Sequence, residues 1–157
     1  MRGAGSSGVV AAAREYLKRL TLTDFGTGDA TGFRDSLDSA TNELTVALPK
    51  QSRHWGLARK GLNIFLRDCL YTVYLRDAFS LQLAEAFFEV PLDSISGKSL
   101  FEQSFGRLPR WKTVRGLTPS LSDKYQLEAS RLASVRKTPR VHLDAIWWGE
   151  RPDPDVA

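Results

Sequence analysis

An amine and a carboxylate are the two side chains of this sequence best suited to chemistry. Lys60 lies in the segment HWGLARKGLN, residues 54–63, and Asp93 follows the run FFEVPL, residues 87–92. An unprotonated lysine amine can attack an electrophilic carbon, and a carboxylate that emerges from an apolar wall can act as a base or stabilise a developing positive charge. A purely structural role is the alternative, since Asp93 and Ser94 are both preferred residues at a helix N-terminus.

A stripe of basic, amide and aromatic side chains accompanies Lys60 along one predicted helix. Its members recur at steps of three or four residues, which places them on one side of the helix. They are Lys60, Asn63, Arg67, Tyr71 and Tyr74. Basic groups neutralise phosphates and tyrosine rings stack on bases, so the stripe is suited to nucleic acid. The alternatives are a solvated face with tyrosines packed beneath a neighbouring helix and, for Arg67, an ion pair with Asp68.

The elements that must hold these groups are predicted to be helices. The clearest lies at 58–73, where apolar residues recur with helical spacing and form one continuous face. They are Ala58, Leu62, Phe65, Leu66, Cys69 and Val73. Similar spacing predicts helices at 9–20, 33–48, 80–88, 95–105, 120–132 and 141–148, with a loop at 107–119. No stretch alternates with a period of two, so we expect an all-α fold, a compact bundle of about six or seven helices.

The composition fits one intracellular domain. With 157 residues, of which 42% are hydrophobic, the chain suffices for one core, so we expect a single helical domain at 9–149 with flexible segments at 1–8 and 150–157. No run approaches about 18 uninterrupted apolar residues, and the start lacks the apolar core of a signal peptide, so a cytoplasmic location without a membrane partner is expected. A net charge of +4 permits DNA as a partner. Trp-rich helices on a small domain leave formation of a homo-oligomer open.

Other classes of site find no support in the residue types. Cys69 stands alone inside an apolar helical pattern, which excludes a disulfide framework and a Cys-rich metal cluster. The two histidines, His54 and His142, have no partner at a strong ligand spacing, so no metal site is expected. No Ser/His/Asp motif occurs, and GTGDATG at 26–32 lacks the lysine of a phosphate loop. No cofactor is expected.

Three short segments resemble the helix-hairpin-helix DNA glycosylase superfamily. GLARKGLN, residues 56–63, is similar to the GVGRKTAN-type turn and helix start of that superfamily, and VPLDS, residues 90–94, to its VDTH-type segment. HLDAIWWG, residues 142–149, is similar to the helix that closes the domain. The chain departs from the pattern at Ala58, where the superfamily has its second hairpin glycine, and in the 33 residues from Lys60 to Asp93, a long gap that requires an inserted helix at 80–88.

The resemblance implies cleavage of the N-glycosidic bond of a base flipped out of DNA. Lys60 would match the lysine that attacks the sugar C1′ in bifunctional members, and Asp93 would match their catalytic aspartate. A tryptophan would stack on the extruded base, unless the tryptophans pack in the core. The candidates are Trp55, Trp111, Trp147 and Trp148. The residues expected to bind nucleic acid around this pair are Arg53, Arg59, Asn63, Arg67, Tyr71, Arg110 and Lys112.

A non-catalytic all-α module that binds nucleic acid or protein is the competing interpretation. It needs only the basic stripe and exposed aromatic residues. Geometry separates the two interpretations, because a catalytic pair requires Lys60 and Asp93 in one cleft within several ångströms of each other, whereas a binding module makes no such demand.

Overall fold

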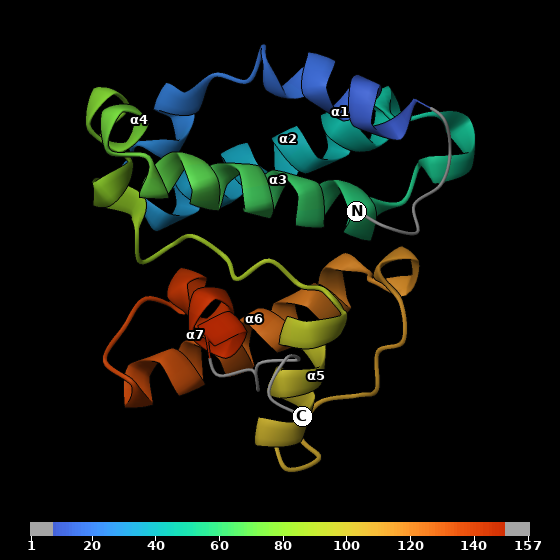
Figure 1. Cartoon of the computed structure of the whole chain (residues 1–157), viewed down its shortest axis with the longest axis vertical. Coiled ribbons are helices and arrows are strands. Elements are labelled where there is room, and N and C mark those ends of the chain that lie inside the picture. The colour runs from blue at the N-terminus through green and yellow to red at the C-terminus, as the bar shows by residue number, and fades with distance from the viewer. Residues whose placement is uncertain (1–7, 150–157) are drawn as a thin grey trace.

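The protein is built from helices (Figure 1). The computed structural model describes residues 8–149, and within this range it contains seven α-helices and five short 3-10 helices. The α-helices are α1 (Val9–Leu17), α2 (Ala30–Ala47), α3 (Trp55–Tyr71), α4 (Val73–Ala78), α5 (Ser94–Gln103), α6 (Pro119–Val135) and α7 (Leu143–Gly149). The 3-10 helices are η1 (Leu22–Phe25), η2 (Lys50–Ser52), η3 (Leu81–Ala84), η4 (Val114–Gly116) and η5 (Arg140–His142).

The expected fold class and the expected number of helices are therefore confirmed. The flexible segments expected at 1–8 and 150–157 lie outside the described residues, except for Gly8, which is the N-cap of α1. None of the helices in residues 8–149 is long and apolar enough to cross a membrane.

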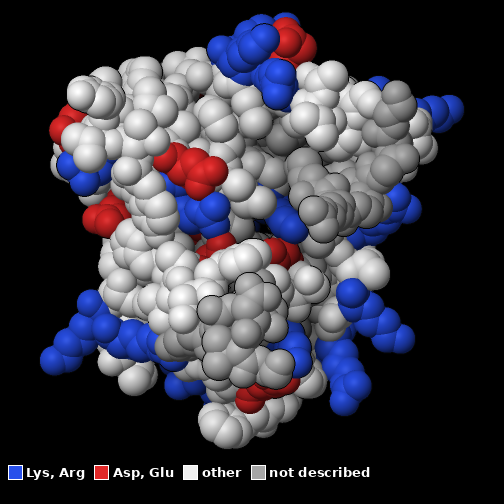
Figure 2. Space-filling view, viewed as in Figure 1, with Lys and Arg blue, Asp and Glu red and all other residues white. Residues whose placement is uncertain are grey.

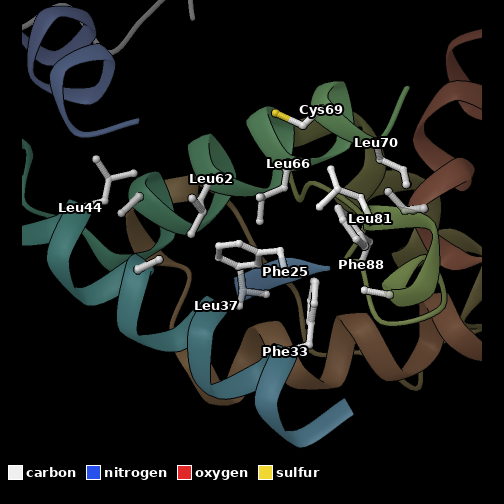
Figure 3. Packing of buried hydrophobic residues seen from close by; sticks show 14 of the residues in the cluster. Phe25, Phe33, Leu37, Leu44, Leu62, Leu66, Cys69, Leu70, Leu81 and Phe88 are labelled. Atoms are coloured by element: carbon white, nitrogen blue, oxygen red, sulfur yellow. The ribbon is translucent and has the colours of Figure 1, made fainter. Parts of the chain in front are cut away.

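Helices α1 to α4 form a first layer, whose core lies between α2 and α3 (Figures 1 and 3). Phe33 and Leu37 of α2 and Leu62 and Leu66 of α3 are buried around Phe25 of η1. The apolar face predicted for the third helix therefore packs against the core over most of its length.

Helices α5, α6 and α7 form a second layer with its own core. Leu100 of α5, Tyr125 of α6 and Leu143 of α7 are buried there together. An extended segment joins the layers, since Phe88 belongs to the first core and Val90 to the second. The residues of this segment are therefore held by both cores at once.

The chain between α3 and this segment differs from the prediction. Thr72 adopts an extended conformation (φ −86°, ψ 106°), so α3 ends before Val73, whose side chain is 54% exposed and does not continue the apolar face. The helix predicted at 80–88 is absent, because Ser80 takes a left-handed conformation (φ 53°) and only Leu81–Ala84 forms a 3-10 helix. This segment is held by burial of Leu81 and Ala84 in the core, and not by continuous helical hydrogen bonds.

A buried ionic network lies where the layers meet. Arg59 on α3 is 1% exposed and forms a bidentate pair with Glu89, donating from Nε to Oε2 at 2.9 Å and from Nη2 to Oε1 at 2.8 Å. Its Nη1 donates to Asp38 Oδ1 at 2.8 Å and to Thr41 Oγ1 at 2.9 Å. Asn63 donates to Glu89 Oε2 at 2.9 Å. The joining segment is thus fixed to the first layer by polar contacts as well as by apolar packing.

The network keeps the Glu89 carboxylate charged inside the protein. Burial raises the pKa of Glu89, but the charge and hydrogen bonds of Arg59, with Arg140 and Asn63, outweigh burial and hold the pKa below its ordinary value. In Figure 2, acidic and basic side chains lie next to one another across the middle of the molecule, at the boundary between the layers. A charge buried in this way is stable only while its partners remain.

Replacement of glycine by alanine is expected to have opposite effects on stability at two positions of α3. A Cβ on Gly56 would lie 2.2 Å from the carbonyl oxygen of Val114 and 2.6 Å from Cβ of Leu117, whereas a Cβ on Gly61 would meet nothing within 4 Å. We expect Gly56→Ala to lower the free energy of unfolding by about 1–3 kcal/mol, because η4 must move. We expect Gly61→Ala to raise it by about 0.5–1 kcal/mol through helix propensity. Chemical denaturation of both variants checks this, and equal effects would contradict the packing of η4 on α3.

Candidate functional site

Lys60 and Asp93 meet at the boundary between the two layers. Lys60 lies on α3, and Asp93 is the N-cap of α5. Lys60 Nζ lies 3.8 Å from Asp93 Oδ2, and the two side chains are 22% and 21% exposed. The predicted amine and carboxylate are therefore brought together from positions 33 residues apart, and both side chains are largely but not fully shielded from water.

The Asp93 carboxylate is held by the start of α5. Its Oδ1 accepts hydrogen bonds from the backbone N–H of Ile95 at 2.8 Å and of Ser96 at 3.0 Å. Ser96 Oγ in turn accepts from the Asp93 N–H at 2.8 Å and donates to the Pro91 carbonyl at 2.7 Å. This capping box confirms the predicted cap, and it leaves Oδ2 for Lys60. Capping therefore fixes the orientation of the carboxylate and does not exclude a role in chemistry.

A cavity of about 530 Å³ lies on one side of the Lys60–Asp93 pair. We call it the basic pocket, because Lys60, Lys98, Arg110 and Lys112 line it against a single acidic residue, Glu102. The remaining lining residues are Ser94, Gly97, Phe101, Trp111, Thr113 and Val114. Two residues predicted to bind nucleic acid, Arg110 and Lys112, thus share one cavity with the predicted nucleophile.

A second cavity of about 320 Å³ is lined by Asp93 and not by Lys60. We call it the Asp144 pocket. It is lined by Ile64, Arg67, Pro91, Asp93, Asp144, Ala145 and Trp148. Lys60 lines the basic pocket and Asp93 lines the Asp144 pocket, so the pair belongs to both cavities. The first cavity is lined mainly by cations, and the second contains carboxylate and aromatic groups.

Asp144 is the polar group of this second cavity whose bonding is incomplete. It is 4% exposed; Arg67 Nη1 donates to its Oδ2, while Oδ1 has no hydrogen-bond partner. Burial raises the pKa of Asp144; Arg67 opposes this, Asp93 adds to it, and Lys60 and Trp148 make smaller opposing contributions. A buried carboxyl oxygen without a partner costs about 1–3 kcal/mol.

Two of the predicted nucleic-acid contacts are corrected by burial. Arg59 and Asn63 are 1% and 4% exposed, and both bond to Glu89 in the network between the layers. They face the interior because Glu89, an acid inside the apolar run FFEVPL, needs cationic and amide partners there. They are not accessible to a nucleic acid, so the basic stripe read from the sequence is partly internal.

The other predicted contacts lie at separate places. Arg67 pairs with Asp144 and, at 2.9 Å, with Asp68, so the expected ion pair with Asp68 is confirmed. The Tyr71 hydroxyl lies 2.8 Å from His142 Nδ1, and the two rings stack at 5.5 Å. Arg53 is exposed and donates to the Leu48 carbonyl at 3.0 Å, and it lines neither cavity.

The four tryptophans divide between core and cavities. Trp147 is 5% exposed in the second core, as the packing alternative predicts. Trp55 packs beneath the guanidinium of Arg59, 5.3 Å from the ring centre. Trp111 lines the basic pocket, and Trp148, 53% exposed, lines the Asp144 pocket. Only the last two are therefore placed to contact a ligand near Lys60.

The glycine-containing turn expected before the long helix is part of that helix. α3 begins at Trp55, so Gly56 lies in its first turn, where the backbone of Val114 and the side chain of Leu117 cover it closely. A hairpin that offers backbone amides to phosphate, which the resemblance implies, is therefore not present in that form.

Sequence reasoning did not identify Asp144 or Glu89 as members of these sites. Asp144 falls two residues after His142 on a short apolar helix, and this spacing does not mark it as a site residue. In both cases the carboxylate lies inside an apolar run of the sequence. This pattern could have indicated a buried acid, and a buried acid requires specific partners.

No known protein family, curated protein or solved structure matches this chain. The function must therefore be argued from the geometry of the site and from the resemblance of its short motifs.

Proposed function

We propose that the protein is a DNA glycosylase-like enzyme that acts on a base extruded from DNA. The observation that carries the proposal is the 3.8 Å approach of Lys60 Nζ to Asp93 Oδ2, in a partly shielded position between two cavities. These are the two residues that match the catalytic positions of the helix-hairpin-helix superfamily. An amine and an acid so placed can act on the same sugar carbon from a common side.

The proposed reaction replaces one bond at the sugar C1′ with another. The bond from C1′ to the base nitrogen breaks and its electron pair leaves with the base, while the unprotonated Lys60 amine forms a bond to C1′. The amine proton passes to the Asp93 carboxylate, which also stabilises the positive charge that develops on the sugar ring. Asp93 then gives this proton to the ring oxygen as the ring opens, which converts the adduct into a protonated imine between Lys60 and the sugar, and the departed base takes a proton from water.

The Asp144 pocket is proposed to receive the base. Trp148 offers an aromatic ring beside it, and the Asp144 carboxyl group also lines the space. A volume of about 320 Å³ is sufficient for a single base. An enzyme that acts on a base of duplex DNA takes that base out of the stack first.

Borohydride trapping tests the proposed function. The full chain is incubated with duplex oligonucleotides that each carry one uracil, one 8-oxoguanine, one alkylated adenine or one abasic site, and the imine is reduced to a stable covalent complex. We expect a complex with at least one modified base and with the abasic site, and an Asp144→Asn variant should change the preference among bases. If no oligonucleotide of the set yields a complex, Lys60 is not a nucleophile towards DNA sugars, and the binding module becomes the better interpretation.

A further inference from the structure

The start of α3 cannot serve as the phosphate-binding surface of this protein. A Cβ on Gly56 would lie 2.2 Å from the backbone of Val114, which shows that η4 packs directly on the first turn of the helix. A phosphate at that position would have to displace η4. If DNA is bound beside Lys60, its phosphates must find cations elsewhere.

The basic pocket offers the required charge. Its four cations face one carboxylate, that of Glu102, which lies 3.7 Å from Lys98. The Lys60 amine has its acidic partner, Asp93, in the other cavity. Arg110 and Lys112 are exposed, and no salt bridge involves either of them within the described residues. The pocket therefore has an excess of positive charge next to the proposed reacting atom.

The loop that carries two of these cations is anchored. Trp111 lies so close over α5 that a Cβ on Gly97 would be 2.1 Å from its ring, and its Nε1 donates to the Thr113 carbonyl at 2.6 Å. The edge of Tyr125 meets the Trp111 ring at 5.8 Å, and the Tyr125 hydroxyl donates to the Pro109 carbonyl at 3.0 Å. The backbone that bears Arg110 and Lys112 is thus fixed from both sides, which lowers the entropy cost of binding.

One cation of the loop is oriented as well. The Arg110 guanidinium lies over the ring of Phe101, 5.6 Å from its centre, so one face of the group is packed while its N–H edge remains available. An arginine held in this way can bind a phosphate with two hydrogen bonds.

We infer that the basic pocket binds the DNA backbone phosphate next to the nucleotide whose base enters the Asp144 pocket, with Arg110 and Lys112 as the principal contacts. The inference rests on the proposed function for the identity of the ligand as DNA. Under this inference the two cavities beside the Lys60–Asp93 pair bind different parts of the nucleic acid. The phosphate is bound on the cationic side and the base on the carboxylate side.

Salt-dependent DNA binding by a charge-removal variant tests the inference. Arg110→Gln/Lys112→Gln removes both cations and keeps the Trp111 anchor. The control Lys18→Gln/Lys124→Gln removes the same charge from the C-cap of α1 and from α6, outside the pocket. The affinity for a duplex oligonucleotide with one abasic site is measured from 50 to 200 mM salt. We expect the slope of log affinity against log salt to become shallower by about 1 per cation, hence by about 2, in the pocket variant. The control variant should change it by less than half as much.

The outcomes separate this inference from the proposed function. Equal slopes in the two variants, or no measurable binding of DNA by the unaltered protein, would overturn the phosphate site. A shallower slope in the pocket variant, together with failure of the unaltered protein to form a borohydride complex, would support the phosphate site and refute the glycosylase reaction.

Discussion

Replacement of Arg59 with methionine is expected to lower the free energy of unfolding by about 3–5 kcal/mol. The substitution keeps an apolar stem of similar length but removes the bidentate partner of Glu89 and a partner of Asp38. Glu89 is 3% exposed, so its carboxylate would remain in the interior without its main cation. Urea denaturation followed by far-ultraviolet circular dichroism measures the effect. Arg53→Met, at an exposed arginine just before α3, is the matched control and should cost less than about 1 kcal/mol.

A second substitution shows whether the loss comes from the unpaired charge. Arg59→Met combined with Glu89→Leu should be more stable than Arg59→Met alone, because both members of the pair are then apolar.

The stabilisation that Arg59 gives through Glu89 should also depend on pH in a defined direction. The pKa of Glu89 is lowered on folding, so its contribution to stability is present above the ordinary value of 4.5 and is lost as the pH falls through the lower folded value. The difference between the unaltered protein and Arg59→Met should therefore shrink below pH 4.5, and a difference that grows there would contradict the account.

Replacement of Lys60 with glutamine is expected to reduce formation of the borohydride complex by at least about 1,000-fold, since removal of a nucleophile removes the covalent route altogether. Lys60 is not part of either hydrophobic core, so the variant should fold. Lys50→Gln, at an exposed lysine of η2, is the control and should leave the yield of the complex unchanged. Equal yields from the two variants would show that another amine reacts.

Asparagine at position 93 separates the capping role of Asp93 from its proposed role in the reaction. Asparagine caps helices about as well as aspartate, so Asp93→Asn should change stability by only a few tenths of a kcal/mol, while the rate of base release falls by about 100-fold or more. Asp93→Ala should lose both functions and cost about 1 kcal/mol in stability. If Asp93→Asn retains the full rate of base release, the carboxylate only caps α5.

The fold was predictable where one periodic pattern dominated. The apolar spacing of residues 58–73 predicted α3 except at Val73, which lies beyond its end, and of the two caps predicted for the next helix, Asp93 and Ser94, the structure has Asp93. The break at Thr72 and the left-handed Ser80 were not predictable, because nothing in the local residue types excludes a helix there. Burial of Leu81 and Phe88 in a core built by distant segments decides their conformation.

The candidate site was predictable in its two central residues and in some of the residues around them, such as Arg110 and Lys112. Lys60 and Asp93 were found from their residue types and short motifs, and their separation of 3.8 Å meets the distance expected of a catalytic pair, although the two residues line different cavities rather than one cleft. Asn63 was predicted to lie in an exposed stripe and Arg59 to contact nucleic acid, because helical spacing alone does not reveal which side faces the second layer. Asp144 approaches the site only through the fold, which brings α7 against α5 and α3.

The most direct measurement of the central claim is the identity of the amine that bonds to DNA. The borohydride-reduced complex with the abasic oligonucleotide is digested with nuclease and protease, and the peptide that carries the sugar remnant is sequenced by mass spectrometry. The account predicts the remnant on Lys60. A remnant on any other lysine or on the N-terminal amine, with none on Lys60, would contradict it.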